Sequence, residues 1–261
     1  MAKSVYYYWI KAGSKVDTDL SMKTQISNIF HQHQGRYGYR RVQLALRNQG
    51  QHLNHKVVQR LMGQLQLKGL TRKKRYRSYR GDVGKTATNI LSRNFHASHP
   101  NQKWVTDITE FNVNGQKVYL SPILDLYNRE IVSYQVDVRP QLGLVMNMLS
   151  KALIRLSPKD HPVLHSDQGW HYQMNPYQRE LKQYGVLQSM SRKGNCLDNA
   201  VIENWFGILK NEFFYKKKFA SIEVFKKSLE EYIHYYNHDR IKQKLKGLSP
   251  VQYRTQSLVL T

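Results

Sequence analysis

Short runs of β-branched and apolar residues follow one another in the middle of the chain, and their composition favours β-strands. They cover residues 103–112, 117–125 and 130–137. The pairs Asn114-Gly115 and Asn128-Arg129 stand between them and are typical of hairpin turns. A helical spacing from about 143 to 156 leads to a further apolar run at 162–166. An antiparallel meander followed by helix crossovers predicts an α/β or α+β fold.

Apolar residues before residue 70 recur at the spacing of helices, predicted at 22–34, 39–49 and 54–68. Gly35 and Gly50 separate these helices. Asn54 is the predicted N-cap of the third helix, and Gly69 the predicted residue after its end. The third helix carries an apolar stripe of Val57, Val58, Leu61, Met62 and Leu65. The pattern predicts a small helix-turn-helix module, and a compact three-helix adaptor or dimerisation module has similar patterning.

A further helical pattern runs from about residue 222 to residue 237, near the end of the sequence. Its apolar positions are Val224, Phe225, Leu229, Tyr232, Ile233 and Tyr236. We expect this stripe to pack against the rest of the core. The basic residues that follow, between Arg240 and Lys246, are expected either to touch DNA or to form a solvated loop.

Charge changes the picture, because 41 Lys and Arg residues stand against 18 Asp and Glu residues, a net charge of +23. An excess of this size indicates a nucleic-acid-binding protein. Residues 1–100 carry 19 of the basic and 3 of the acidic residues. The densest run, residues 72–80, has six basic residues and two tyrosines. It is interpreted as part of a linker that contacts DNA in a salt-dependent way, or as a solvated tether that can order on DNA.

Three carboxylates, at Asp107, Asp167 and Glu203, stand in contexts that would direct them to one place. Asp107 lies in a strand-like run, and Asp167 follows another. Glu203 lies on a helix-like stretch, where Asn199, Phe206, Gly207 and Lys210 share its face and Asp198 and Glu212 do not. Carboxylates suit Mg²⁺ or Mn²⁺, and two such ions can support in-line phosphoryl transfer. Any one of these acids alone would more often be structural.

Sequence motifs around these acids carry a resemblance to a known family. Asp167 and Glu203 are separated by 35 residues, with His165-Ser166-Asp167-Gln168-Gly169 and Asp198-Asn199-Ala200 as flanks. Further motifs are Tyr37 to Arg41, Trp104 to Thr109, Tyr236-Asn237 to Arg240, and Leu248 to Pro250. Together they resemble the DDE transposases of bacterial insertion sequences, of the OrfB type related to retroviral integrases.

The resemblance implies a ribonuclease H-like mixed five-stranded sheet with flanking helices, preceded by a small helical domain. It implies that Asp107, Asp167 and Glu203 are the catalytic residues and the ligands of two Mg²⁺ ions, with Mn²⁺ as substitute. The implied partners are double-stranded DNA at element ends and target, at least one further copy of the chain, and an OrfA protein or fusion part. The implied reaction cleaves and joins DNA strands, with water and then a DNA 3′-OH as nucleophile.

Basic residues predicted to contact DNA come from the resemblance, from the helical module and from the basic run. They are Lys210, Arg192, Lys193, Arg40, Arg41, Lys56, Arg60, Arg72, Lys73, Lys74, Arg75, Arg77 and Arg80.

The expected domains divide the chain into four parts. They are a helical DNA-binding domain at 1–70, a basic linker at 71–100, a catalytic core at 101–221 and a helical C-terminal extension at 222–261.

Two other functions fit the sequence: a metal-dependent nuclease of the same fold that joins nothing, and a non-catalytic DNA-binding regulator. A joined product separates the transposase from the nuclease. A Cys-rich zinc site is excluded because Cys196 is the only cysteine, and His165 and His171 are expected to support the site or the structure. No span of about 20 apolar residues is present, so a soluble, cytoplasmic protein without a membrane partner is expected.

Overall fold

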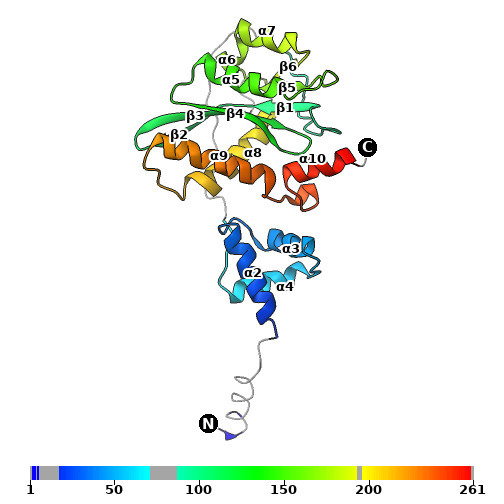
Figure 1. Cartoon of the computed structure of the whole chain (residues 1–261), viewed down its shortest axis with the longest axis vertical. Coiled ribbons are helices and arrows are strands. Elements are labelled where there is room, and N and C mark those ends of the chain that lie inside the picture. Colours follow the sequence, from blue (N-terminus) through cyan, green and yellow to red (C-terminus); the bar gives the residue numbers. More distant parts are fainter. Residues whose placement is uncertain (1, 4, 6–17, 71–86, 193–195, 260–261) are drawn as a thin grey trace. The chain divides into compact units, whose positions relative to one another are not determined.

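The computed structural model describes residues 2–3, 5, 18–70, 87–192 and 196–259 (Figure 1). The chain divides into two compact units, residues 1–70 and residues 71–261. Each unit has its own buried apolar residues. They are therefore described separately.

In the described part of the first unit, three helices pack on one another. They are α2 (Leu20–Gln32), α3 (Tyr39–Asn48) and α4 (His55–Gln64). The predicted breaks are confirmed, because Gly35 and Gly50 have φ of 71° and 83°, a region that glycine enters without strain. Asn54 is the N-cap of α4, and its side chain accepts a hydrogen bond from the Lys56 N–H at 2.9 Å.

The end of α4 differs from the prediction that Gly69 terminates this helix. The helix ends at Gln64, and Gln66 takes the left-handed conformation with φ of 56°. The Leu67 N–H then donates to the Met62 carbonyl at 2.8 Å. Gly69 instead lies against Gly38, because a Cβ at Gly69 would come within 2.6 Å of the Gly38 nitrogen. Its missing side chain therefore permits two backbone segments to cross.

The second unit is built on a mixed sheet, with six strands among the residues described. They are β1 (Lys103–Thr106), β2 (Thr109–Val113), β3 (Gln116–Asp125), β4 (Ile131–Asp137), β5 (Val163–Ser166) and β6 (Leu187–Met190). Strand β3 is antiparallel to β1, β2 and β4, whereas β5 is parallel to β1 and β6. The strand predicted at 103–112 is interrupted at Asp107 and Ile108, which gives six strands where five were expected.

Both predicted hairpin turns are present. Asn114 and Gly115 have φ of 52° and 83°, the pair of positive values that a two-residue hairpin loop requires. In the second turn, Arg129 has φ of 64°, and its N–H donates to the Asp125 carbonyl at 2.9 Å. These turns fix the register of β2, β3 and β4.

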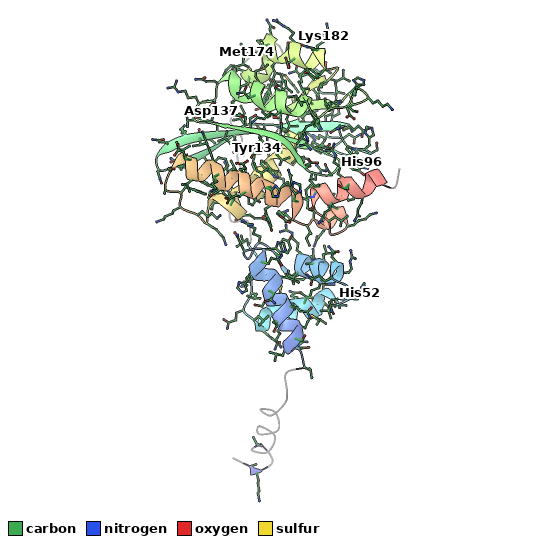
Figure 2. The ribbon with its side chains drawn as sticks, viewed as in Figure 1. His52, His96, Tyr134, Asp137, Met174 and Lys182 are labelled. Carbon is green, nitrogen blue, oxygen red and sulfur yellow. The ribbon has the colours of Figure 1, made fainter. Side chains whose placement is uncertain are left out.

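Helices cover both faces of the sheet (Figure 1). One face packs on α5 (Leu142–Leu153), α6 (Trp170–Gln173) and α7 (Asn175–Gln183). Figure 2 labels Met174 at the N-cap of α7 and Lys182 in its last turn. The other face packs on α8 (Ala200–Leu209), the π-helical turn η2 (Lys210–Phe214) and α9 (Ile222–His238). Trp104 and Val105, adjacent in β1, belong to opposite clusters, as the alternation of a strand requires.

The C-terminal motif residues attach α9 to the sheet and to η2. The Asn237 side chain binds both the N–H and the carbonyl of Ile131, at 2.9 and 3.0 Å. Arg240 forms a buried pair with Glu212 in η2, with N–O distances of 2.6 and 2.8 Å. The predicted stripe of α9 is buried apart from Val224, which is 47% exposed. The last elements are the short η3 (Gln243–Leu245) and α10 (Pro250–Val259).

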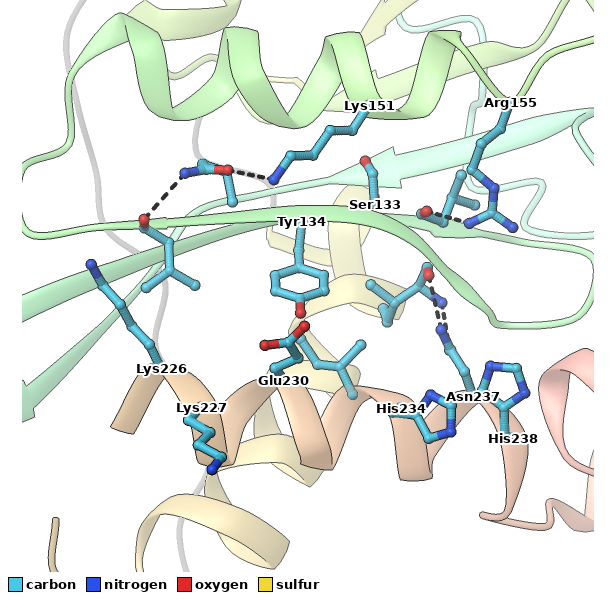
Figure 3. Close-up of a pocket in the computed structure, with 15 residues that line it drawn as sticks. Ser133, Tyr134, Lys151, Arg155, Lys226, Lys227, Glu230, His234, Asn237 and His238 are labelled. Atoms are coloured by element: carbon cyan, nitrogen blue, oxygen red, sulfur yellow. Dashed lines mark hydrogen bonds between the residues drawn. The ribbon is translucent and has the colours of Figure 1, made fainter. Parts of the chain in front are cut away.

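The outer edge of β4 lines a groove of about 820 Å³ between α5 and α9 (Figure 3). Side chains form hydrogen bonds with polar backbone groups of this edge. Asn237 binds the N–H and the carbonyl of Ile131, and Arg155 donates to the Val132 carbonyl. An edge occupied in this way is protected against pairing with a further strand. None of the three acids predicted for catalysis lines the groove. Among the residues described, no helix has the length and apolar character needed to cross a membrane.

Arg240→Met is expected to lower the free energy of unfolding by about 3–5 kcal/mol, because it leaves the buried Glu212 carboxylate unpaired. The double variant Glu212→Gln with Arg240→Met should recover part of this loss. Lys117→Met is the control, since its pair with Glu110 is 63% and 43% exposed and contributes at most about 1 kcal/mol. Urea denaturation followed by circular dichroism measures all three. Equal losses in Arg240→Met and Lys117→Met would contradict the prediction.

Candidate active site

Two of the three predicted acids follow neighbouring parallel strands. Asp107 is the first residue after β1, and Asp167 is the first residue after β5. Because β1 and β5 pair in parallel, with Val105 opposite His165, their carboxyl ends lie at the same edge of the sheet. Each carboxylate is oriented by a backbone N–H at its Oδ1 atom, from Ile108 at 2.7 Å and from Gly169 at 2.9 Å.

Helix α8 supplies the third acid from its first turn. Ile202 and Phe206 are fully buried and pack this helix on the sheet. Asn199, just before the helix, donates from Nδ2 to the Thr106 carbonyl at 3.2 Å. That bond joins the start of α8 to the residue before Asp107. It therefore connects the element that carries Glu203 to the strand that carries Asp107.

The negative charges of the other two acids act on Asp107. Burial raises the pKa of Asp107 well above its usual range, and the negative charges of Asp167 and Glu203 raise it further. The hydrogen bond from Ile108 and the charge of Lys210 act in the opposite direction. Burial also raises the pKa of Asp167, against the hydrogen bond from Gly169. Asp107 is largely excluded from water, since it is only 7% exposed, whereas Asp167 and Glu203 are half-buried.

Lys210 was predicted to contact DNA at this site. In the structure its charge lies within electrostatic reach of Asp107. Burial lowers the pKa of Lys210, while the charges of Glu110 and Asp107 raise it. Its Nζ atom lies 5.3 Å from the centre of the Phe111 ring. The ammonium group therefore lies near the Phe111 ring of β2 and within electrostatic reach of Asp107.

The donor set fits a divalent metal ion by its chemistry, because the acids are hard oxygen donors whose mutual repulsion a cation would offset. As the side chains stand, no three His, Cys, Asp or Glu groups in the described part of the chain enclose an ion. Asp107, Asp167 and Glu203 are the residues that would hold one.

The other acids near α8 are neutralised by arginines. Asp198 is buried and accepts hydrogen bonds from Arg192 Nε at 3.1 Å and Arg93 Nε at 2.8 Å. The bond from Arg192 is the main reason that the pKa of Asp198 lies well below its usual range. Glu212 pairs with Arg240 in the same manner. Asp198 and Glu212 are therefore committed to ion pairs within the fold.

Both histidines that flank Asp167 are held in hydrogen bonds. The Ser189 hydroxyl accepts from the Ile90 and Leu91 N–H groups at 2.9 and 3.2 Å, so it donates its proton to His165 Nδ1 at 2.8 Å. Burial lowers the pKa of His165 to about 4, which keeps the ring neutral. His171 Nε2 lies 2.7 Å from the Pro140 carbonyl and donates to it. These contacts agree with a supporting role.

Predicted DNA-contact residues are distributed over both units. Arg40 and Lys56 are exposed, and Arg60 pairs with Asp19 at 2.9 Å. Arg41 donates from Nη1 to the Arg36 carbonyl at 3.0 Å. Arg192 is 60% exposed although it pairs with Asp198. Residues outside the described part are Lys193, Arg72, Lys73, Lys74, Arg75, Arg77 and Arg80.

The segment from residue 87 onward was predicted as linker, but it is bound to the catalytic unit. Asn89 donates from Nδ2 to Asp198 at 3.0 Å, and the neighbouring N–H groups bind Ser189. Leu91 is buried in the core beside Val105. The polar composition of this segment gave no sign of the bonds to Asp198 and Ser189, because both partners lie about a hundred residues away.

Comparison with known proteins places these observations in a family. Two families described as integrase core domain match residues 97–196 and 203–258, and one described as HTH-like domain matches residues 17–75. The putative transposase InsK of insertion sequence element IS150, from Escherichia coli K12, is 57% identical over 98% of this chain and 90% of that protein. The chain belongs to this family of insertion-sequence transposases.

Further relatives include a transposase-like protein of Haemophilus influenzae, 54% identical over 79% of this chain and 95% of that protein. Among solved structures, the HTLV-2 integrase catalytic core domain in complex with magnesium is 16% identical, with a TM-score of 0.48. The match covers 61% of this chain and 99% of the integrase core chain. The predicted fold class and the enzyme class, a DDE-type transposase or integrase, are confirmed.

Asp107→Asn is expected to stabilise the metal-free protein, because it removes a buried charge that two other acids repel. A carboxyl group whose pKa is raised in the folded state costs stability at neutral pH, so the midpoint of urea denaturation at pH 7 should rise in the variant. Mn²⁺ or Mg²⁺ should raise the Tm of the unchanged chain and have little effect on the variant.

Asp198→Asn is the matched control, because its carboxylate is paired with Arg93 and Arg192. It should destabilise the protein by about 1 kcal/mol, since both arginines are partly exposed and their charges are screened. A loss of stability in Asp107→Asn as well would contradict the charge balance described.

Proposed function

We propose that this transposase cleaves a DNA strand at the end of its insertion sequence and joins the freed 3′ end to a target strand. Support comes from the meeting of Asp107, Asp167 and Glu203 at the ends of β1 and β5 and the start of α8. The observation that carries the proposal is the influence of both other acids on Asp107. It indicates one site built from three distant parts of the chain.

Each side chain has a role that follows from its position. Asp107 is the acid whose pKa both of the other acids raise. Asp107, Asp167 and Glu203 would together hold two Mg²⁺ or Mn²⁺ ions, and such a pair would stabilise the attacking and leaving oxygens of an in-line displacement. Lys210 would bind a DNA phosphate beside Asp107. The buried strand ends hold these groups rigidly and exclude bulk water.

The proposed reaction has two phosphoryl transfers. In the first, water attacks a phosphodiester and frees a DNA 3′-OH; in the second, that 3′-OH attacks a phosphodiester of the target. The second step exchanges one phosphodiester for another, so positioning of the strands supplies most of the acceleration. No covalent intermediate with the protein forms in either step.

The proposed partners are DNA and further copies of the chain. The helical unit, matched by the HTH-like family, would bind double-stranded DNA through residues such as Arg40 and Lys56. Two element ends and a target require at least a dimer on DNA. An OrfA protein or fusion part, proposed from the resemblance to OrfB-type transposases, would add end recognition.

A nuclease of the same fold would keep the acids and lose the joining step. A regulator would bind DNA and need none of the three acids. The regulator is disfavoured by the acids themselves, because a buried cluster of like charges costs stability and is retained here with Lys210 beside it.

Glu203→Gln is expected to abolish both cleavage and joining while leaving DNA binding intact. The full chain would be incubated with labelled DNA from the borders of its gene and Mg²⁺ or Mn²⁺, and the products resolved by gel electrophoresis. The matched control is Glu231→Gln, an exposed acid on α9, which should react like the unchanged chain. Cleavage without joined product would favour the nuclease, and full activity in Glu203→Gln would refute the assigned site.

Lys210→Gln is expected to slow single-turnover joining by roughly 10- to 100-fold, the loss typical of a charged hydrogen bond to phosphate. Lys216→Gln, at an exposed position a few residues further on, is the control and should change the rate little. Equal rates for the two variants would show that Lys210 does not contact the reacting strand.

A further inference from the structure

Trp170 is a large aromatic side chain that the fold leaves half exposed. Its exposed fraction is 48%, whereas Trp104 and Trp205 are 0% and 2% exposed. It is the first residue of α6 and stands three residues after Asp167. About half of the indole surface is therefore accessible to a ligand.

The loop that carries Trp170 is held tightly around Asp167. The Gly169 N–H donates to Asp167 Oδ1 at 2.9 Å, and a Cβ at Gly169 would itself lie 2.9 Å from that oxygen. Gln168 donates from Nε2 to the Ser191 carbonyl at 3.0 Å, and Gln173 donates back to the Gln168 carbonyl. The position of the indole relative to the carboxylate is therefore set by the backbone.

One side of the indole is stacked on the imidazole of His171, with ring centres 3.9 Å apart and planes at 26°. His171 is itself fixed by its bond to the Pro140 carbonyl, and it lies close enough to Asp167 to feel the charge of that carboxylate. The indole therefore stacks on an imidazole that lies within electrostatic reach of the Asp167 carboxylate. The rings are rigid, so a planar partner could bind with little loss of side-chain entropy.

We propose that Trp170 is a stacking platform for an unpaired DNA base close to the reacting phosphodiester. This inference rests on the proposed function, which places the scissile phosphate at Asp107, Asp167 and Glu203. Three residues of chain span at most about 10 Å, and successive nucleotides rise about 3.4 Å. The platform would thus reach a base within about three nucleotides of that phosphate. Every base presents a π-face, so stacking there would be tolerant of sequence.

The test uses the full chain with Glu203→Gln, so that the DNA is not consumed. The probe is a duplex from the border of the gene with a three-nucleotide unpaired 3′ end that carries 2-aminopurine at each position in turn. Stacking on Trp170 should quench its fluorescence at one position. Trp170→Ala should abolish the quench and weaken binding by roughly 5- to 100-fold, the usual effect of losing one stacked base. Trp170→Phe should restore most of both.

Tyr184→Ala is the matched control, because this tyrosine is 41% exposed at the end of α7; it should leave the quench unchanged. An unchanged quench in Trp170→Ala would overturn the proposal. Loss of self-association in Trp170→Ala, measured by sedimentation, with the quench intact would also overturn it and assign the indole to a protein contact. The quench requires neither cleavage nor joining. If Glu203→Gln shows the quench but the unchanged chain never joins DNA, the proposed function is refuted while base stacking on Trp170 is supported.

Discussion

The rest of this structure depends on one constraint, the repulsion between carboxylates. The fold brings these groups together around the buried Asp107. Asp107 is buried and carries the influence of both Asp167 and Glu203. A cluster of this kind persists only if the surrounding elements resist the repulsion. The parallel pairing of β1 with β5 fixes two of the acids, and the bond from Asn199 to the Thr106 carbonyl ties the helix of the third to the same strand.

Three other buried acids of this unit form ion pairs with arginines. Asp198 binds Arg192 and Arg93, Glu212 binds Arg240, and Glu130 binds Arg155 at 2.7 Å. These three acids are committed to arginines, whereas the carboxylates of Asp107, Asp167 and Glu203 are the ones whose charge a bound cation would neutralise. The arginine pairs also have a mechanical effect: Glu212 lies in the π-helical turn that begins at Lys210, and Arg240 fixes that turn from beyond the end of α9.

Local patterns predicted the features that local physics decides. The Asn114-Gly115 turn, the Asn54 N-cap and the breaks at Gly35 and Gly50 follow from residue conformational preferences, and all were found. The proximity of Asp107 and Asp167 follows from strand composition together with the resemblance. The end of α4 was mispredicted, because Gln66 accepts a left-handed conformation and Gly69 serves a backbone crossing instead. The partners of Asp198 and the docking of residues 89–91 were missed, because they are long-range contacts that no periodicity encodes.

The central claim is that three acids from β1, β5 and α8 form one cation-binding catalytic site. A crystal structure of the full chain grown with Mn²⁺ tests it most directly, because the anomalous scattering of manganese locates the ion independently of the protein atoms. The account predicts anomalous peaks in contact with the carboxylates of Asp107, Asp167 and Glu203. Fully loaded crystals with no peak at these carboxylates, or with manganese held only by other residues, would contradict it.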